Sequence, residues 1–262
     1  MARSKIALII AAGLIVVVAP IVYVVLFGVQ TVMAVEARHI AHKSPDAWQT
    51  PVPLPDTSVS SMAHKKVSYF GYELELPWDD VDETKSKTFD KIRVTAFQSG
   101  NSFFLSIFPP NSFVKELTKD YKIKADTFRR AYGEQATESD YGFYSRMLAV
   151  TPDSIGPFMT QSEDGGNLSL LVIKAIATPE ADSGIFEIRS GDYRGFQFES
   201  ADGRPARIID DLYSADEGIE LHFSQKAGGS APNITQPEIN RVLQSIHKIP
   251  APSAGSAAKR LP

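Results

Sequence analysis

The fold is decided by residues 92–108, which read IRVTAFQSGNSFFLSIF. Apolar and polar side chains alternate over residues 92–96, which is typical of a half-buried strand, and residues 103–108 are rich in strand-forming side chains. The separator Ser99-Gly100-Asn101 has turn chemistry. We therefore expect an antiparallel hairpin, ended by two prolines at 109 and 110, and the rest of the fold is built outward from it.

The spacing of apolar residues differs between the two sides of this hairpin. Before it, Tyr72, Leu74 and Leu76 alternate with glutamates, so this segment is also expected to be a strand. After it, residues 111–178 have helical patterns and capping residues. Residues 168–176, LSLLVIKAI, fit either a buried helix or a central strand, and we favour a helix.

The last third of the chain predicts a sheet closed by a helix. Four apolar runs, at 185–188, 193–198, 206–213 and 219–223, are separated by turn residues, which indicates an antiparallel meander. From Thr235 a helix is expected, with an apolar stripe that should lie across the sheet. The stripe consists of Ile239, Val242, Leu243 and Ile246. The predicted fold class is α+β, in which one soluble domain over 67–249 has a mainly antiparallel sheet and an inserted helical segment.

The N-terminal region predicts a membrane anchor. Residues 6–27 read IALIIAAGLIVVVAPIVYVVLF, and no charged side chain occurs from Ile6 to Val35. An apolar helix of about 20 residues matches a hydrocarbon core of about 30 Å. We therefore expect a transmembrane helix over 6–35 that contacts the bilayer through residues 6–27. A signal peptide has a shorter apolar stretch, and a cleaved secreted protein stays as the alternative.

The flanking charges predict the orientation of this anchor. Arg3 and Lys5 lie in a basic flank, residues 1–5, whereas Arg38 and Lys43 after the span are partly offset by Glu36. The basic side of a span tends to stay in the cytoplasm. We expect a single-pass protein of the cell membrane with its N-terminus cytoplasmic and its domain outside.

Two further segments are predicted from composition. Residues 36–66 form a juxtamembrane region and a stalk whose four prolines favour extended backbone. Residues 250–262 are small and proline-rich, and are expected to be a disordered tail.

Charge and cysteine content limit the function classes. The chain has 27 basic and 31 acidic residues, a net charge of −4, and its part after residue 43 is more acidic still. An acidic domain repels phosphate backbones, so nucleic acid is not an expected partner. There is no cysteine, which excludes disulfides, thiolate metal sites and cysteine nucleophiles.

Two small sets of residues are weak candidates for catalysis. Ser112 and Lys115 match S-x-x-K, but the S-D-N and K-T-G elements of β-lactamase-like enzymes are missing, and a helix-capping serine with a solvated lysine explains them better. Glu220, His222 and Ser224 share one face of a predicted strand, where a solvated face is the simpler interpretation. Asp210-Asp211 are adjacent, so on a strand they point to opposite faces.

An acidic cluster at residues 79–83 is the weak candidate for a metal site. Asp79, Asp80, Asp82 and Glu83 place four carboxylates in five residues, which suits a hard cation such as calcium. The cluster lacks the glycine of a calcium-binding loop, and a solvated exit from a strand is the preferred interpretation. No cofactor or metal is predicted.

One resemblance covers only the end of the domain. An antiparallel sheet with a closing helix that ends LQSIHKI, residues 243–249, is loosely similar to small bacterial lipoprotein-type and photosystem-accessory α+β domains. No functional residue carries this similarity, so no family is assigned. The sequence as a whole predicts an anchored binding or envelope-assembly module with a membrane or envelope protein as partner, and a membrane-anchored hydrolase is the alternative.

Overall fold

The chain mixes helices with a large sheet, as its sequence predicts. A computed structural model describes residues 28–61, 65–120, 124–156, 161–178, 184–200, 207–226 and 234–250. The contacts divide the chain into two compact units. The helical unit comprises Met1–Thr50 and Asn111–Glu180, and the sheet unit comprises Pro51–Pro110 and Ala181–Pro262. Most of the helical unit is thus inserted into the sequence of the sheet unit.

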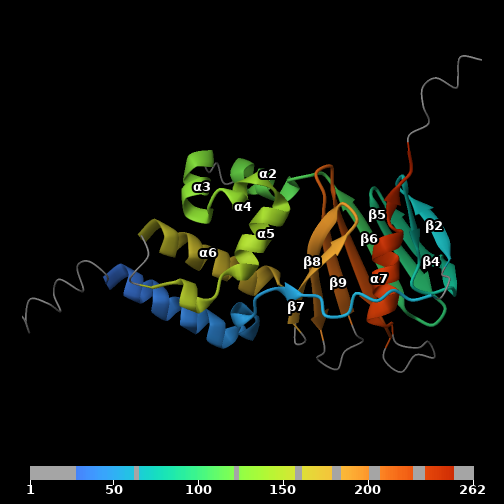
Figure 1. Cartoon of the computed structure of the whole chain (residues 1–262), viewed down its shortest axis with the longest axis horizontal. Coiled ribbons are helices and arrows are strands. Elements are labelled where there is room, and N and C mark those ends of the chain that lie inside the picture. The colour runs from blue at the N-terminus through green and yellow to red at the C-terminus, as the bar shows by residue number, and fades with distance from the viewer. Residues whose placement is uncertain are drawn as a thin grey trace, which may run out of the picture. The chain divides into compact units, whose positions relative to one another are not determined.

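The sheet unit is built on eight strands (Figure 1). They are β1 (Val52–Pro53), β4 (Val81–Phe89), β5 (Ile92–Phe97), β6 (Ser102–Phe108), β7 (Gly184–Ser190), β8 (Tyr193–Ser200), β9 (Arg207–Tyr213) and β10 (Gly218–Ser224). Their order is β1-β7-β8-β9-β10-β6-β5-β4, and every pairing is antiparallel except that of β1 with β7. The predicted hairpin and meander are therefore confirmed, and β10 pairs with β6 to join them.

A smaller sheet and one helix complete this unit. β2 (Lys66–Tyr69), β3 (Tyr72–Glu75) and β11 (His247–Lys248) pair in the order β11-β3-β2. The helix α7 (Gln236–Ser245) begins with a capping box between Thr235 and Glu238, because each side chain bonds the other's backbone amide. In Figure 1, α7 lies across one face of the large sheet.

The core of the sheet unit lies between α7 and the large sheet. Ile239, Val242 and Leu243 of α7 pack in one buried cluster with alternate residues of the strands, such as Leu105 and Leu221. We call this the inner face of the sheet, and the opposite side the outer face. The predicted apolar stripe of α7 is thus confirmed. The strand residues of this cluster share one face of the sheet, because alternate residues of a strand project to opposite faces.

The helical unit contains the inserted helices and a helix over residues 28–43. Its elements are a helix over residues 28–43, η1 (Pro45–Trp48), α2 (Ser112–Asp120), α3 (Ala125–Tyr132), α4 (Gln135–Glu138), α5 (Asp140–Ala149), η2 (Pro152–Ser154) and α6 (Gln161–Ala177). Residues 168–176 lie in α6, so the expected helix is confirmed. Gly166 lets α6 approach α3 closely, because a Cβ there would lie 1.9 Å from the Ala131 carbonyl oxygen.

Most of the predicted anchor lies outside the described residues. Within the described ranges, no helix is long and apolar enough to cross a membrane. The helix over residues 28–43 covers the end of the predicted span and the first residues of the predicted stalk, and it buries Ala37 and Ala41. The predicted tail also falls outside the description from residue 251 onward.

The proline-rich residues 51–60 are held by the sheet unit. Leu54 N donates to Glu187 O at 3.2 Å after β1 has paired with β7. The Asn240 amide on α7 then donates to the carbonyl oxygens of Asp56 and Ser58, at 2.9 and 2.7 Å. Pro53 lies in β1, whereas Pro45 of the predicted stalk lies in the 3-10 helix η1 (Pro45–Trp48). Residues 51–60 are integral to the fold of the sheet unit, which composition alone did not reveal.

Candidate functional site

Two adjoining hollows form a groove in the sheet unit. The larger, of about 830 Å³, is lined by the β7–β8 turn, the β9–β10 turn and the chain from α7 into β11. The smaller, of about 330 Å³, lies between β1, β7 and α7. Arg189, Ser190 and Gln244 line both hollows, so we treat them as one feature and call it the edge groove.

The walls of the edge groove are set by short turns. Gly191 has a positive φ of 56°, which lets β7 turn into β8 within two residues. The buried hydroxyl of Ser190 donates to Leu243 O at 2.9 Å and fastens the end of β7 to α7. On the other side, the Ser214 hydroxyl accepts from Glu217 N at 3.2 Å and closes the β9–β10 turn. The groove is therefore pre-formed by backbone and hydroxyl hydrogen bonds.

The basic groups of the edge groove are already paired. Arg189 contacts Glu187 at 3.2 Å, and Lys248 contacts Glu217 at 3.3 Å. The Lys248 ammonium also lies 5.9 Å from the centre of the Tyr72 ring. These cations therefore neutralise neighbouring carboxylates within the groove wall.

Two carboxylates of the groove give it an acidic centre. Asp192 comes from the β7–β8 turn and Asp216 from the β9–β10 turn, and both line the larger hollow. Burial raises the pKa of Tyr193, and the nearby charges of Asp192 and Asp216 raise it further. The C-terminal end of α7, which carries partial negative charge, lines the same hollow. The edge groove is therefore suited to a positively charged group.

The predicted row on β10 is partly brought together on the outer face. His222 Nε2 and Glu220 Oε1 lie 2.7 Å apart, and the Phe104 ring lies 4.7 Å from the His222 ring. Ser224 shares this face but lies opposite Ser102 of β6.

Asp211 joins Glu220 and His222, which the sequence did not predict. It lies directly opposite Glu220 in the β9–β10 register, whereas Asp210 points to the inner face, as adjacency predicts. Burial raises the pKa of Asp211 to about 8, and the Glu220 charge adds to this effect. The sequence alone did not place Asp211 beside Glu220, because that contact depends on the register between β9 and β10. We call Asp211, Glu220 and His222 the outer-face cluster.

The predicted Ser112 and Lys115 pair lies on the first turn of α2. Asp140 caps this turn, since its carboxylate accepts from Phe113 N at 3.3 Å and from Val114 N at 2.9 Å. Asn111 in return accepts from Asp140 N at 3.2 Å. The expectation that Ser112 provides the cap is therefore wrong, because a carboxylate from α5 satisfies the amides.

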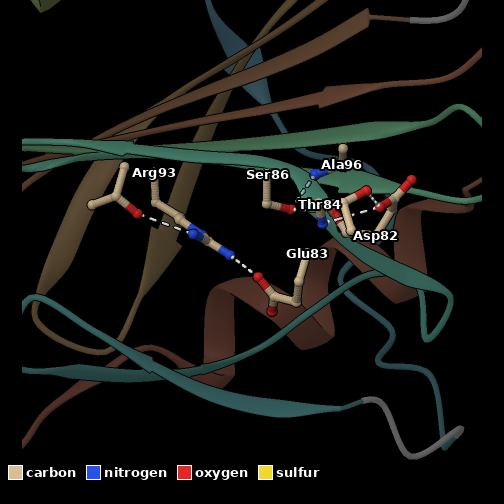
Figure 2. Close-up of polar contacts among 7 residues, drawn as sticks. Asp82, Glu83, Thr84, Ser86, Arg93 and Ala96 are labelled. Atoms are coloured by element: carbon tan, nitrogen blue, oxygen red, sulfur yellow. Dashed lines mark hydrogen bonds and ion pairs between the residues drawn. The ribbon is translucent and has the colours of Figure 1, made fainter.

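The predicted metal cluster is divided among separate partners, as Figure 2 shows for Asp82 and Glu83. Asp82 accepts from the Thr84 hydroxyl at 2.5 Å and pairs with Lys85 at 2.9 Å, and these contacts, the first above all, lower its pKa to about 2. Glu83 pairs with Arg93 at 2.7 Å. Asp80 accepts from a turn amide, Ser99 N, at 2.7 Å.

Asp82 and Glu83 belong to the edge strand β4, whereas Asp79 and Asp80 precede it. β4 is the last strand of the sheet, and its register with β5 shifts between Asp82 and Lys87. Ser86 bridges the bulge, since it donates to Asp82 O at 2.8 Å and accepts from Ala96 N at 3.0 Å (Figure 2). Among the residues that the structure describes, no group of three or more Asp, Glu or His side chains is arranged to hold a metal ion.

The comparisons with known proteins do not identify this chain. No protein family and no curated protein matches it. A crystal structure from Bacteroides thetaiotaomicron VPI-5482 aligns with 71% of this chain and 49% of its own, at 12% identity and a TM-score of 0.33. This chain thus spans about half of that one, and a likeness at this level supports no inference about fold or function.

Proposed function

We propose that this protein is a single-pass membrane protein whose sheet unit binds a partner through the edge groove. The support for the anchor is the uncharged apolar run of residues 6–27. In the helix that follows, Val29, Val32 and Val35 recur every three residues and are 52%, 68% and 63% exposed. Such a stripe suits the border of a lipid phase. The N-terminus is cytoplasmic, and the domain that follows the span lies outside.

The observation that carries the binding function is the pre-formed groove with its acidic centre. Asp192 and Asp216 face a hollow large enough for several side chains, and the turns around them are already ordered by hydrogen bonds. A site that is formed before binding loses little conformational entropy when the partner arrives. The partner is a membrane or envelope protein with a basic segment.

The anchor is tested by fractionation of intact cells that express the full chain. We expect the protein to stay with membranes in alkaline carbonate, and an external protease to cleave it after residue 43. Release by carbonate with residues 1–27 still attached would refute the anchor, and cleavage from the cytoplasmic side only would reverse the orientation.

The groove is tested by photo-crosslinking in the same cells. A benzophenone amino acid replaces the exposed Gln244 in the groove, and the control replaces the exposed Lys87 on β4, at the opposite edge of the sheet. We expect a discrete crosslinked protein from Gln244 and none from Lys87. Equal labelling from both positions, or none from either, would contradict the proposal.

A hydrolase is the second candidate, because of the 2.7 Å contact between Glu220 and His222 beside Asp211. A carboxyl with a raised pKa, such as that of Asp211, is a common feature of sites for general acid–base chemistry. A panel of nitrophenyl esters, phosphates and glycosides tests it. Turnover that is lost in Glu220→Gln would support the enzyme, and turnover that this variant retains would exclude the cluster as its centre.

A further inference from the structure

The strand β7 has one incompletely covered edge. On one side it pairs with β8 over its full length, from Gly184 to Ser190. On the other side β1 pairs only with Phe186 and Glu187, and the last hydrogen bond runs from Leu54 N to Glu187 O. β1 ends at Pro53 and does not reach Arg189.

The main chain of Arg189 points to this edge. In an antiparallel ladder, residues alternate between those that bond the neighbouring strand and those that direct both groups away from it. Since the Glu187 carbonyl bonds the β1 side, the amide and carbonyl of Arg189, two residues on, point to the same side. Arg189 lines both hollows of the edge groove.

The chain after β1 is held away from this edge. After Leu54 N has bonded Glu187 O, the following backbone groups bond α7 instead of β7. Asn240 binds the carbonyl oxygens of Asp56 and Ser58, and Arg241 Nη1 donates to Ser60 O at 2.9 Å. The diversion along α7 is thus fixed by hydrogen bonds, and the smaller hollow keeps a strand edge on one wall and a helix on the other.

We propose that the edge groove takes an extended segment of the partner, which adds to β7 at Arg189 and places a lysine or arginine beside Asp192 and Asp216. This inference rests on the proposed function and names the partner's chemistry. Main-chain pairing supplies affinity in strand addition, and side-chain pockets supply specificity. The acidic centre lies at the end of β7, so the basic residue follows or precedes the paired residues by a few positions.

The test uses the full-length protein in nanodiscs and a set of fluorescent peptides. Each heptapeptide alternates threonine and valine, and one lysine is moved through the seven positions; matched peptides carry glutamate instead. We expect at least one lysine peptide to bind by fluorescence anisotropy, and its glutamate partner to bind at least about tenfold more weakly, because charge complementarity sets the difference. Methylation of alternate backbone nitrogens of the peptide should abolish binding.

Protein variants and hydrogen exchange locate the peptide. Asp192→Asn with Asp216→Asn should weaken the lysine peptide about tenfold, and the control Asp90→Asn on the β4–β5 turn should not. The Arg189 amide should exchange at least about tenfold more slowly with peptide bound, which a purely electrostatic contact would not produce.

The outcomes separate this inference from the proposed function. If no lysine peptide binds but Gln244 still crosslinks a protein in cells, the groove binds a partner by another mode, and the strand-addition inference is wrong. If neither occurs, both the inference and the proposed function fail. Binding that tolerates backbone methylation would also overturn strand addition.

Discussion

Two ionisable side chains with strongly shifted pKa values, one in each unit, meet opposite surroundings. Lys174 in α6 is fully buried, and its ammonium donates to the carbonyl oxygens of Ala47, Gln49, Leu148 and Val150. Burial lowers the pKa of Lys174 to about 8, against the charge of Asp46. Its charge is therefore solvated by peptide dipoles of two separate segments of the helical unit, residues 47–49 and 148–150.

Asp211 in the sheet unit has the reverse situation. It faces Glu220, a group of the same charge, across the β9–β10 ladder, and burial raises its pKa to about 8. The comparison teaches that burial alone does not distinguish structure from function. A buried charge with matched partners holds a fold together, whereas one beside a like charge favours exchange of a proton and marks a place where chemistry or regulation is available.

The largest expected effect is the loss of the Lys174 ammonium. Lys174→Met leaves four buried carbonyl oxygens without their shared donor, so we expect the helical unit to lose about 3 kcal/mol or more of stability. Urea unfolding measures the loss of stability, and hydrogen exchange of the α6 amides shows whether it affects the helical unit. Lys119→Met, at an exposed position of α2, should change stability by less than about 0.5 kcal/mol. Equal effects of the two variants on stability would show that the hydrogen bonds of Lys174 do not stabilise the helical unit.

The second effect is an opposite dependence of stability on pH. The folded pKa of Asp211 is raised from its ordinary value of 3.8 to about 8, so the folded state binds the extra proton in this window and stability should fall as the pH rises from about 4 to 8. The folded pKa of Lys174 is lowered from 10.5 to about 8, so stability should rise between about pH 8 and 10.5. Neither slope can exceed about 1.4 kcal/mol per pH unit for one proton.

The variants Asp211→Asn and Lys174→Met assign each pH range to one of the two side chains. Thermal unfolding between pH 4 and 10.5 should lose its acid-side slope only in Asp211→Asn and its alkaline-side slope only in Lys174→Met. A profile in which either variant flattens both windows would show that the two groups are coupled, against the comparison above.

A smaller effect sharpens the account of Asp211. Glu220→Gln removes the like charge but not the burial, and burial is the larger cause of the raised pKa. A carboxyl ¹³C NMR titration should therefore show the Asp211 pKa lowered from about 8 but still above its ordinary value of 3.8. A full return to 3.8 would mean that Glu220, and not burial, holds the proton.

The smallest effect is expected at the exposed carboxylates of β4. Asp82→Asn removes an acceptor for Thr84 and a partner for Lys85, and pairs at the protein surface contribute little to stability. Because the folded pKa of Asp82 is lowered to about 2, its contribution is present above about pH 4 and is lost as the pH falls toward 2. Acid titration of the unfolding midpoint measures it, and a change above pH 4 would be inconsistent with this assignment.

Local periodicity accounts for what the sequence predicted correctly. The hairpin of β5 and β6, the meander of β7 to β10 and the cap of α7 each follow from residues close together in the chain. The alternation in β5 did not predict which face of the strand is buried, since Thr95 is fully buried and Val94 only half-buried. The register with Phe103 decides this, and no local pattern contains it.

The candidate sites depend on contacts that are distant in sequence. Glu220 and His222 were recognisable as a row on one strand, but Asp211 enters only through the β9–β10 register. The edge groove combines two turns and the end of α7. Lys174 lay inside a run read as a buried helix, and nothing near it in sequence indicated that its acceptors come from residues 47, 49, 148 and 150.

The bulged and charged β4 has a consequence for assembly. Sheets with two free edges are able to join end to end into open-ended polymers, and charges and bulges at an edge prevent this. Because Lys85 and Lys87 stand beside the register shift of β4, growth of the sheet is blocked on that flank. A segment that adds beside β7, as we propose, therefore cannot be matched by a second strand that adds beside β4.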